Sequence, residues 1–378
     1  MINIKENFYL KITVVIPTYN RRKYLFRSVK YWEDLNVSVI IADGSDKELE
    51  SNIVSSFGNK TRYIYDKKNL VERLSGICNY ISTEYVCMMG DDEFYLSSSV
   101  LQAIKELEQD HELVACMGEA IGFRYKSGKI EYKNVYPELR GYIIENDCRW
   151  DRIRRHMQNY ACSTIYAVCR KKSWIWAIQE SSTVNCNVFS IFEYSFEILM
   201  SCEGKSKIIP YLHWMRSFEE GPAQHYNEIN IVYWWFSKSR QAEKEKYLTL
   251  LIDSISKRYK IKADLVYLPL TEAIEGFIMR AIRDNTTKIT NLRWIILDLL
   301  NYSTPRIVSL IRLFMYYALI FKSPKKNIHI DDGKDIVGIG LTHEMIVNEL
   351  YNKNIFVNIE ELNQITLTVT KFHKKYNI

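Results

Sequence analysis

Short apolar runs and longer segments with helical spacing alternate along the N-terminal part of the chain. The runs at 11–17 and 37–43 are rich in Val and Ile and end in turn-forming residues, as strands buried on both faces do. Between them, residues 21–34 carry apolar side chains at near-helical spacing, which predicts a crossover helix joining two parallel strands. We therefore expect the α/β class, with a mostly parallel, Rossmann-like sheet flanked by helices.

The alternation continues further along the chain. We expect strands at 62–66, 84–92, 113–125 and 129–136 and helices at 70–81 and 97–110, the last with a serine cap. From about residue 226 the pattern is mainly helical, so we place a domain boundary near residue 225. The predicted units are a sheet domain at 1–225, a helical domain at 226–330 and a small appendage at 331–378 with a helix near 342–353.

Polar clusters follow three of the expected strands. They are Thr18–Asn20, Asp43–Ser45 and the acidic run Asp91–Glu93. In parallel sheets, ligands bind beyond the carboxyl ends of the strands, so we expect all three clusters to line one crevice.

The acidic run Asp91, Asp92 and Glu93 is the strongest candidate for a metal site. Adjacent carboxylates at the end of a buried strand repel one another and lose solvation, which favours binding of a positive partner. Mg²⁺ and Mn²⁺ take such oxygen ligands and commonly add substrate phosphates. The alternative is a solvated turn between a strand and a helix.

Composition and charge narrow the class of protein. Hydrophobic residues make up 47% and charged residues 25% of the 378 residues, enough for a globular protein of about two domains. The net charge is +6, and residues 226–330 alone hold 17 Lys/Arg against 9 Asp/Glu. No helix-turn-helix, zinc-finger or RNP signature accompanies this dilute charge, so we do not expect nucleic acid as a partner.

Cysteine usage and hydropathy favour the cytoplasm. The eight cysteines show no Cys-x-x-Cys spacing, which favours reduced, packed thiols. The first residues lack the pattern of a secretory signal, so we expect a cytoplasmic protein. The longest apolar stretch, at 307–321, is shorter than the ~20 residues of a spanning helix and contains Arg312, so we do not expect it to cross a bilayer.

Residues 226–330 mix Lys and Arg with Trp, Tyr and Phe. Apolar stripes at helical spacing usually face inward, so these aromatic residues are expected to form the core of the second domain. The competing interpretation is a peripheral contact with an anionic membrane surface, which would place the protein at the inner face of the membrane.

The motifs "TVVIPTYNR", "DGS" and "GDDE", in this order and spacing, resemble the family 2 glycosyltransferases of the GT-A fold over roughly residues 11–215. The resemblance implies a nucleotide-diphosphate sugar donor, with a UDP-sugar favoured. It also implies that Pro17, Thr18 and Tyr19 contact the nucleotide and that Asp43 reads the edge of the base. The alternative for Asp43 is a turn residue before Gly44.

Two motifs depart from the family pattern. The Arg-Asn pair before the metal strand is separated here, so Arg73 is a candidate for the diphosphate or ribose, with a surface ion pair to Glu72 as the alternative. The acidic triplet begins after Gly90. We favour Asp91 and Glu93 as metal ligands, with Asp92 as the alternative, and expect Asp91 and Asp92 also to face the sugar nucleotide.

In the family, the general base opens a helix that ends at a glycine before a basic strand. Residues 191–210 have this shape, and Glu193, eleven residues before Gly204, takes the position of the base. The alternative is that Glu193 and Glu197 form an exposed face one helical turn apart.

Two further candidates follow at 211–217. The resemblance implies that His213 adds a metal ligand, and a packed histidine is the alternative. Arg216 is expected to neutralise the leaving diphosphate. We expect the segment from Ser217 to Tyr226 to form a lid over the site, with His225 contributing to it.

Together these features predict an inverting, metal-assisted glycosyltransferase acting on a glycan or a lipid-linked acceptor. The Lys-, Ile- and Asn-rich composition is typical of AT-rich bacterial genomes, which favours surface polysaccharide synthesis. A sugar-nucleotide pyrophosphorylase is disfavoured because the turn after the first strand reads "PTYNRRK" and is not rich in glycine. A non-catalytic assembly or membrane-docking subunit with the same fold is the remaining alternative.

Overall fold

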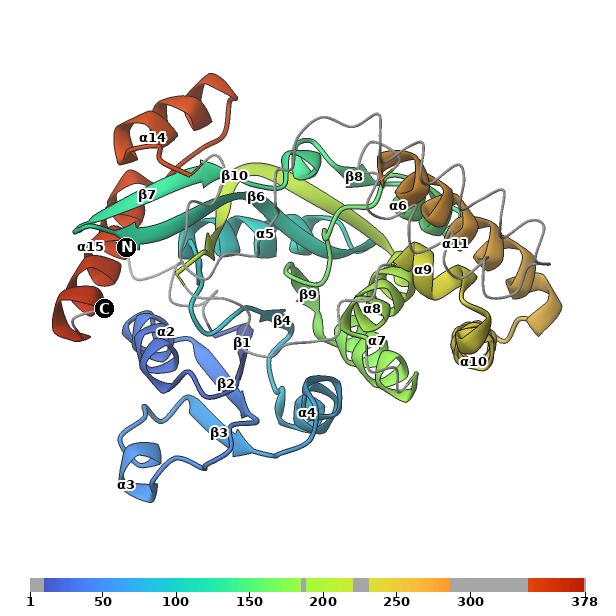
Figure 1. Cartoon of the computed structure of the whole chain (residues 1–378), viewed down its shortest axis with the longest axis horizontal. Helices are drawn as coiled ribbons and strands as arrows, with labels where there is room; N and C mark the ends of the chain where they lie inside the picture. The colour runs from blue at the N-terminus through green and yellow to red at the C-terminus, as the bar shows by residue number, and fades with distance from the viewer. Residues whose placement is uncertain (1–9, 185–187, 220–230, 286–338, 377–378) are drawn as a thin grey trace, which may run out of the picture.

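A ten-stranded sheet forms the centre of the protein in the computed structural model, which describes residues 10–184, 188–219, 231–285 and 339–376 (Figure 1). The strand order is β3-β2-β1-β4-β9-β6-β10-β5, with β7 beside β6 and β8 beside β10. Helices flank this sheet, and further helices follow it in the C-terminal part. The predicted α/β fold class is confirmed.

The first four strands of the order are parallel. They are β1 (Ile12–Thr18), β2 (Ser38–Asp43), β3 (Thr61–Tyr65) and β4 (Tyr85–Met88). The predicted crossover helix is α2 (Arg22–Asp34), which buries Leu25, Val29 and Trp32. Two short helices, α3 (Ser51–Val54) and α4 (Leu70–Ile77), connect the other strands. The sequence therefore predicted this half of the sheet correctly.

The other half of the sheet is mixed, so the sheet as a whole is mixed and not mostly parallel as expected. This half contains β5 (Phe94–Tyr95), β6 (Leu113–Lys126), β7 (Lys129–Asn134), β8 (Ile143–Ile144), β9 (Val168–Arg170) and β10 (Lys205–Ser217). Strands β6 and β10 are parallel, while β9 runs antiparallel between β4 and β6. Strand β4 ends at Met88, earlier than predicted, so the acidic run lies in the turn between β4 and β5.

Helix α5 (Ser97–Gln109) forms as predicted, but its cap differs from the prediction. Leu96 occupies the N-cap position and makes no side-chain cap. Instead the Glu361 carboxylate accepts hydrogen bonds from the backbone N–H groups of Ser97 and Ser98. A residue distant in sequence thus satisfies the first amides of the helix, a role that no local pattern predicts.

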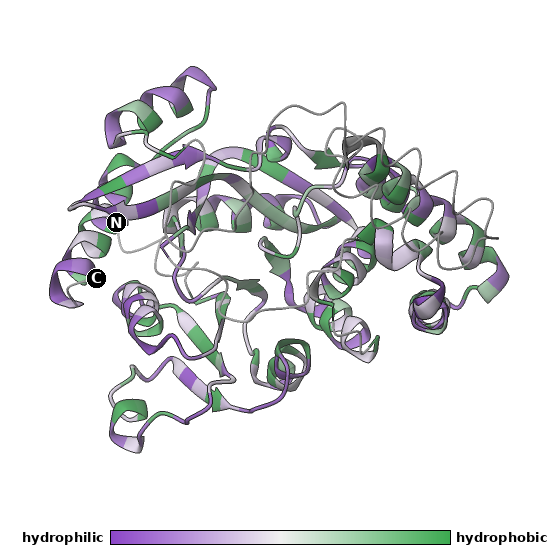
Figure 2. Ribbon diagram, in the orientation of Figure 1, coloured by the Kyte–Doolittle hydropathy of each residue, from purple (hydrophilic) through white to green (hydrophobic). Residues whose placement is uncertain are grey.

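The remaining helices surround the second half of the sheet. Helices α6 (Arg149–Gln158), α7 (Lys171–Thr183) and α8 (Phe189–Glu203) pack together, and α11 (Ala263–Asn285) lies against α6. Helices α9 (Ile231–Phe236) and α10 (Gln241–Tyr259) complete this group. Their buried apolar side chains join the same core cluster as β1 and β2. Figure 2 shows hydrophobic residues along these helices and along the strands of the sheet.

The C-terminal helices α14 (His343–Asn352) and α15 (Ile359–Tyr376) cover β6, β7 and β10 with a second apolar cluster. The helix expected near 342–353 is thus confirmed. The predicted boundaries at 225 and 330 both lie outside the described residues and stay predictions.

The cysteines and the hydropathy of the helices can be described for part of the chain. No helix among the described residues combines the length and apolar character needed to span a bilayer. The apolar stretch at 307–321 lies outside the described residues. The seven described cysteines are free thiols.

Candidate active site

The carboxyl ends of β1, β2 and β4 meet at one edge of the sheet. Thr18 and Asp43 are partners in the register of β1 and β2, and the Thr18 hydroxyl donates a hydrogen bond of 2.7 Å to Asp91 Oδ2. Thr18, Asp43 and Asp91 are all buried. The structure thus brings together the three clusters that the sequence placed at this edge.

Arg73 fastens the ends of β1 and β2 to each other. Its Nη1 atom donates to the carbonyls of Thr18, at 2.8 Å, and of Ala42, at 3.1 Å. The residue is buried, so the surface ion pair with Glu72 is wrong. A Cβ added to Gly44 would lie 2.1 Å from Arg73 Nη1, which explains why glycine stands there.

Asp43 and Tyr19 both lie at this edge of the sheet. Asp43 Oδ1 accepts from the backbone N–H of Ser45 at 2.8 Å, and Oδ2 accepts from the Tyr63 hydroxyl at 2.8 Å. The turn contact proposed as the alternative for Asp43 is therefore present. Tyr19 donates to Asp46 at 3.1 Å and, like Pro17, is partly exposed. The nucleotide contacts of these residues stay predictions.

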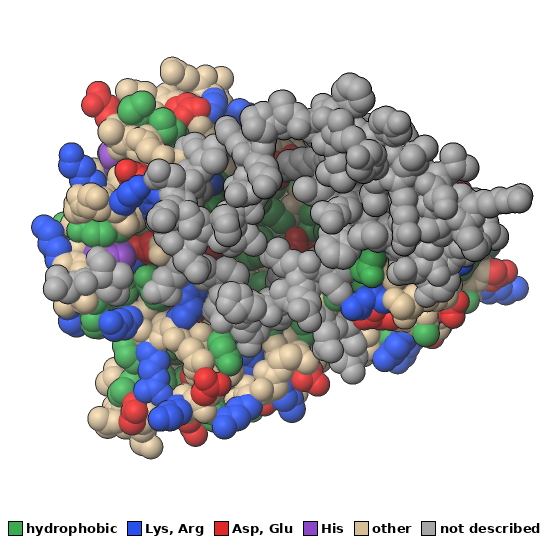
Figure 3. All heavy atoms as spheres, viewed as in Figure 1, with side chains coloured by type: hydrophobic (Ala, Val, Ile, Leu, Met, Phe, Trp, Pro, Cys, Tyr) green, Lys and Arg blue, Asp and Glu red, His purple; other side chains and the backbone are tan. Residues whose placement is uncertain are grey.

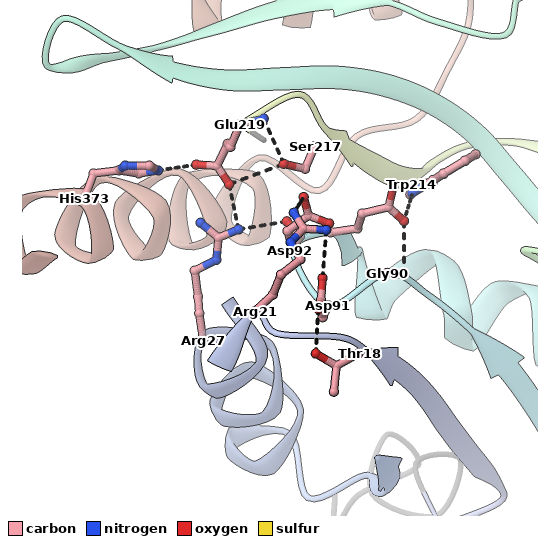
Figure 4. A network of polar contacts seen from close by, with 11 residues as sticks. Thr18, Arg21, Arg27, Gly90, Asp91, Asp92, Trp214, Ser217, Glu219 and His373 are labelled. Carbon is pink, nitrogen blue, oxygen red and sulfur yellow. Dashed lines mark hydrogen bonds and ion pairs between the residues drawn. The ribbon is translucent and has the colours of Figure 1, made fainter. Parts of the chain in front are cut away.

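Arg21 lies between two carboxylates of the acidic run (Figure 4). Its Nη1 atom is 3.2 Å from Asp91 Oδ1, and its Nη2 atom forms an ion pair with Asp92. Burial, and then the charge of Asp92, raise the pKa of Asp91 to about 7. A guanidinium thus already neutralises part of this run.

Glu93 is held by neutral donors on the other side of the run. Its Oε2 atom accepts from Trp214 Nε1 at 3.0 Å and from the backbone N–H of Gly90 at 3.2 Å. Trp214 is itself stacked between Tyr136 and Tyr166, with ring centroids 5.1 and 4.5 Å away. Burial, and then Asp92, raise the pKa of Glu93 to about 8.

The carboxylates of the acidic run are ligands of the kind that a hard cation takes. The oxygens of this run are crowded and buried, and two of its carboxylates already hold a guanidinium, so they fit a positive group. Among the described residues, no three His, Cys, Asp or Glu side chains converge as metal ligands.

His213 lies apart from the acidic run. Its Nδ1 atom is 2.9 Å from Ser99 Oγ, and its ring packs 4.8 Å from the ring of Tyr95. Burial lowers the pKa of His213 to about 3. The next residue, Trp214, contacts Glu93, and successive strand residues point to opposite faces of a sheet. These contacts are those of a packed histidine, which was the alternative to a metal ligand.

A network of polar contacts that the sequence did not predict connects the acidic run to α15 (Figure 4). Arg27 Nη2 donates to the carbonyl of Asp92 at 2.8 Å and to Glu219 Oε2 at 2.7 Å. Glu219 also contacts His373 Nε2 of α15. Burial pushes the pKa of Glu219 upward, but His373 and Arg27 outweigh burial and hold this pKa below its usual value. The basic segment "NRRKYLFR" after the first strand was the available signal for Arg21 and Arg27.

Glu193 and Glu197 of α8 have different surroundings. Glu193 is partly exposed and accepts a hydrogen bond from the Tyr160 hydroxyl. Burial raises the pKa of Glu193 to about 7. Glu197 is fully buried and accepts from the Thr164 hydroxyl at 2.6 Å and from the backbone amides of Thr164 and Ile165. The exposed-face alternative is therefore wrong for Glu197.

Tyr166 and Arg216 lie near the acidic run. Burial, then Glu193 and then Glu93, raise the pKa of the Tyr166 hydroxyl, which places this ring within the electrostatic reach of both carboxylates. The Arg216 guanidinium lies 5.1 Å from the Tyr136 ring and lowers the pKa of Glu93 against the stronger effects of burial and Asp92. Most of the predicted lid, including His225, lies outside the described residues.

Comparison with known proteins gives one family and one group of structures. Residues 13–172 match the family described as Glycosyl transferase family 2. The sequence has no significant match among curated proteins. The chain is similar to the crystal structure of S. aureus TarS 1-349, with 11% identity, a TM-score of 0.42, and coverage of 73% of this chain and 92% of that chain. TarS 1-349 in complex with UDP-GlcNAc gives 12% identity and the same TM-score and coverage. Similarity at this level carries no argument about function.

Proposed function

The chain belongs to glycosyl transferase family 2 through residues 13–172, and from this premise we propose that it is an inverting enzyme that uses a nucleotide-diphosphate sugar, with a UDP-sugar favoured. The acceptor that we propose is a glycan or a lipid-linked sugar in surface polysaccharide synthesis. The reaction would take place in the cytoplasm, at or near the inner face of the membrane.

The contact between Thr18 and Asp91 is the observation that carries this proposal. It joins the end of the strand assigned to the nucleotide to the run assigned to the diphosphate. Arg73 holds the end of β2, and with it Asp43, against the same place. A nucleotide bound at Pro17–Tyr19 and Asp43 would therefore direct its phosphates toward the acidic run.

We propose that the acidic run holds Mg²⁺ or Mn²⁺ together with the diphosphate oxygens. Asp91 and Glu93 are the proposed ligands, with Asp92 as the alternative, while His213 is left out because it contacts Ser99. The ion would supply positive charge to the leaving diphosphate. Arg216, near Glu93, is placed to add a second positive charge there.

Glu193 is the residue that we propose as the general base. Its pKa of about 7 suits proton transfer near neutral pH, and the Tyr160 hydroxyl fixes its orientation. In the proposed step, the acceptor hydroxyl gives its proton to Glu193 while its oxygen forms a bond to the anomeric carbon. The bond from that carbon to the nucleotide diphosphate breaks, and the diphosphate leaves with the electron pair on the opposite face.

The experiment is a panel of nucleotide sugars tested for binding and for hydrolysis or transfer with and without Mn²⁺ and Mg²⁺. We expect Asp91→Asn to lose the metal-dependent part of nucleotide binding. We expect Glu193→Gln to bind nucleotide normally but to transfer sugar about 10²- to 10⁴-fold more slowly. Asp253→Asn and Glu272→Gln, at exposed helix positions, are the matched controls and should behave as wild type.

The outcomes separate the parts of the proposal. If no nucleotide binds in the presence of either metal ion, the enzyme proposal is wrong. If nucleotide binds and Glu193→Gln transfers sugar at the wild-type rate, only the assignment of the base fails.

The position of Arg21 favours a second candidate function. Because its guanidinium already pairs with Asp91 and Asp92, the run could be neutralised permanently, as in a subunit that kept the fold and lost catalysis. Such a subunit would show no metal-dependent nucleotide binding, and Arg21→Ala would not create any.

A further inference from the structure

Side chains of α2 and α15 meet along a groove on the side of the protein away from β3 (Figure 1). The two helices are joined by a hydrogen bond of 3.1 Å from the Tyr31 hydroxyl to Glu361 and by the rings of Tyr24 and Phe372, 5.0 Å apart. The groove has a volume of about 600 Å³, comparable to that of small-ligand sites.

The rims of the groove are basic. Lys23 and Lys30 of α2 and Lys371 and Lys375 of α15 line it, and Asp34 is the sole acidic residue among its described lining. Asp34 pairs with Lys30 at 2.6 Å. The part of the chain that the structure describes places no carboxylate within ion-pair distance of Lys23, Lys371 or Lys375. Figure 3 shows blue side chains along the left edge, where Figure 1 places α2 and α15.

The spacing of these lysines aligns their charges. Lys23 and Lys30 are two helical turns apart, and Lys371 and Lys375 are one turn apart, so each pair lies on one face of its helix. Lys23 and Lys375 lie 4.9 and 5.2 Å from the ring of Tyr376. Several lysines along one groove favour an anionic ligand that contacts both helices.

The floor of the groove is apolar. Phe26 and Leu35 of α2 and Leu367 and Phe372 of α15 line it, and Leu367 is 51% exposed. A free phosphate ion would use the lysines but would leave this floor exposed to water. A ligand with an anionic head and an apolar body would satisfy both parts of the groove.

We propose that this groove binds anionic phospholipid and docks the protein on a membrane surface. The lysines would contact the phosphate head groups, and the apolar floor would contact the glycerol and upper acyl region. Two rows of exposed lysines on neighbouring helices suit an extended anionic surface better than a single acidic side chain of a protein partner. Arg27 lines the same groove and contacts the acidic run, so docking here would bring the candidate active site close to the bilayer.

The test is sedimentation of the full chain with vesicles of phosphatidylcholine alone or with 30 mol% phosphatidylglycerol, a composition chosen as about that of an anionic leaflet. We expect the wild type to bind the anionic vesicles and to dissociate as salt is raised. The double variant Lys371→Glu/Lys375→Glu should bind more than about 25-fold more weakly, because loss of each lysine charge near the surface costs about fivefold and the new glutamates add repulsion. Lys105→Glu/Lys172→Glu, exposed on α5 and α7, carries the same charge change outside the groove and should bind as wild type.

A second variant separates lipid from free phosphate. Leu367→Ser should weaken vesicle binding several-fold while leaving binding of inorganic tripolyphosphate unchanged. The proposal is overturned if wild type does not distinguish the two vesicle types, if both double variants lose binding equally, or if Leu367→Ser has no effect on vesicles. The readout is vesicle binding, so it is independent of sugar transfer and of the proposed function.

Discussion

The two carboxylate clusters of the candidate site differ in what surrounds them. At the sheet edge, Asp91 and Asp92 pair with the guanidinium of Arg21, and Glu219 behind them pairs with Arg27. On α8, Glu193 and Glu197 accept from hydroxyls and backbone amides, and the one basic side chain within ion-pair distance of them among the described residues is His156, 3.0 Å from Glu197.

Burial is the largest cause of the raised pKa of Asp91 and of Glu193, but the second-largest contribution differs between the two. For Asp91, crowding by Asp92 adds to burial, and a cation would relieve that repulsion. For Glu193, burial raises the pKa, the Tyr160 hydrogen bond partly offsets burial, and the charge of Glu197 adds a smaller rise. On this difference rests our proposal of cation binding at the sheet edge and proton transfer at α8.

Among substitutions in the two clusters, we expect that of Glu219 to cause the largest loss of unfolding free energy. Glu219→Gln leaves Arg27 and His373 buried without their carboxylate, and breaking such a pair costs about 3 kcal/mol of unfolding free energy. Urea unfolding followed by circular dichroism measures this loss. Glu112→Gln, at an exposed pair with Lys205, is the control and should change stability by less than about 1 kcal/mol.

The contribution of Glu219 should also depend on pH. Its pKa in the folded protein lies below the usual 4.5, so its stabilising effect is present at neutral pH and is lost as the pH falls through the folded value. The difference between wild type and Glu219→Gln should shrink in acid. An equal difference at pH 7 and pH 3 would contradict this account of the cluster.

Stabilisation of the folded protein by Mg²⁺ tests whether a cation binds at the acidic run. Asp91 must be ionised to bind the ion, and its pKa is about 7, so saturating Mg²⁺ should raise stability by about 2 kcal/mol at pH 8 and by less at pH 6. Thermal unfolding with and without Mg²⁺ measures this effect. It should vanish in Asp91→Asn and persist in Glu193→Gln. Its persistence in Asp91→Asn would place the ion elsewhere.

A neutral contact on α8 should matter less than the charged pair behind the sheet edge. Thr164→Val removes one hydroxyl donor from Glu197 and leaves both backbone donors, so we expect a loss of about 1 kcal/mol in unfolding free energy. Thr271→Val, at a partly buried position on α11, is the control for the same substitution. A loss as large as that of Glu219→Gln would remove the distinction between the clusters.

Local patterns predicted the part of the site that lies on parallel strands. Strands β1, β2 and β4 are short and apolar with polar residues directly after them, so the sequence alone brought Thr18, Asp43 and Asp91 to one edge. The shape of α8 followed by Gly204 and β10 was expected from the family resemblance.

Contacts between distant segments could not be predicted from local patterns. Glu361 and His373 lie in a helix that the sequence marked only as part of an appendage, yet they contact Ser97 and Glu219. The metal role of His213 was expected from the family resemblance, but the alternation along β10 directs Trp214 to Glu93 and leaves His213 against Ser99. Position along the chain does not say which face of a strand meets the site.

We expect the smallest effect from loss of the Tyr160 hydroxyl, which donates a hydrogen bond to the candidate base Glu193. The Tyr160 hydrogen bond lowers the pKa of Glu193 against the larger effect of burial. Because the base acts in its ionised form, kcat/KM for sugar transfer should rise with pH through about 7 in wild type. In Tyr160→Phe this pKa rises, and the acidic limb should move upward by about half a pH unit.

The matched control for this shift is Tyr194→Phe. The Tyr194 ring lies 5.2 Å from the Tyr160 ring, and its substitution removes a neighbouring hydroxyl without touching the hydrogen bond to Glu193. Its acidic limb should stay where the wild type has it. A limb that stays in place in Tyr160→Phe, or that moves equally in both variants, would mean that a group other than Glu193 takes the proton. The proposal of proton transfer at α8 would then fail, and the proposal of cation binding at the sheet edge would depend only on the Mg²⁺ experiment.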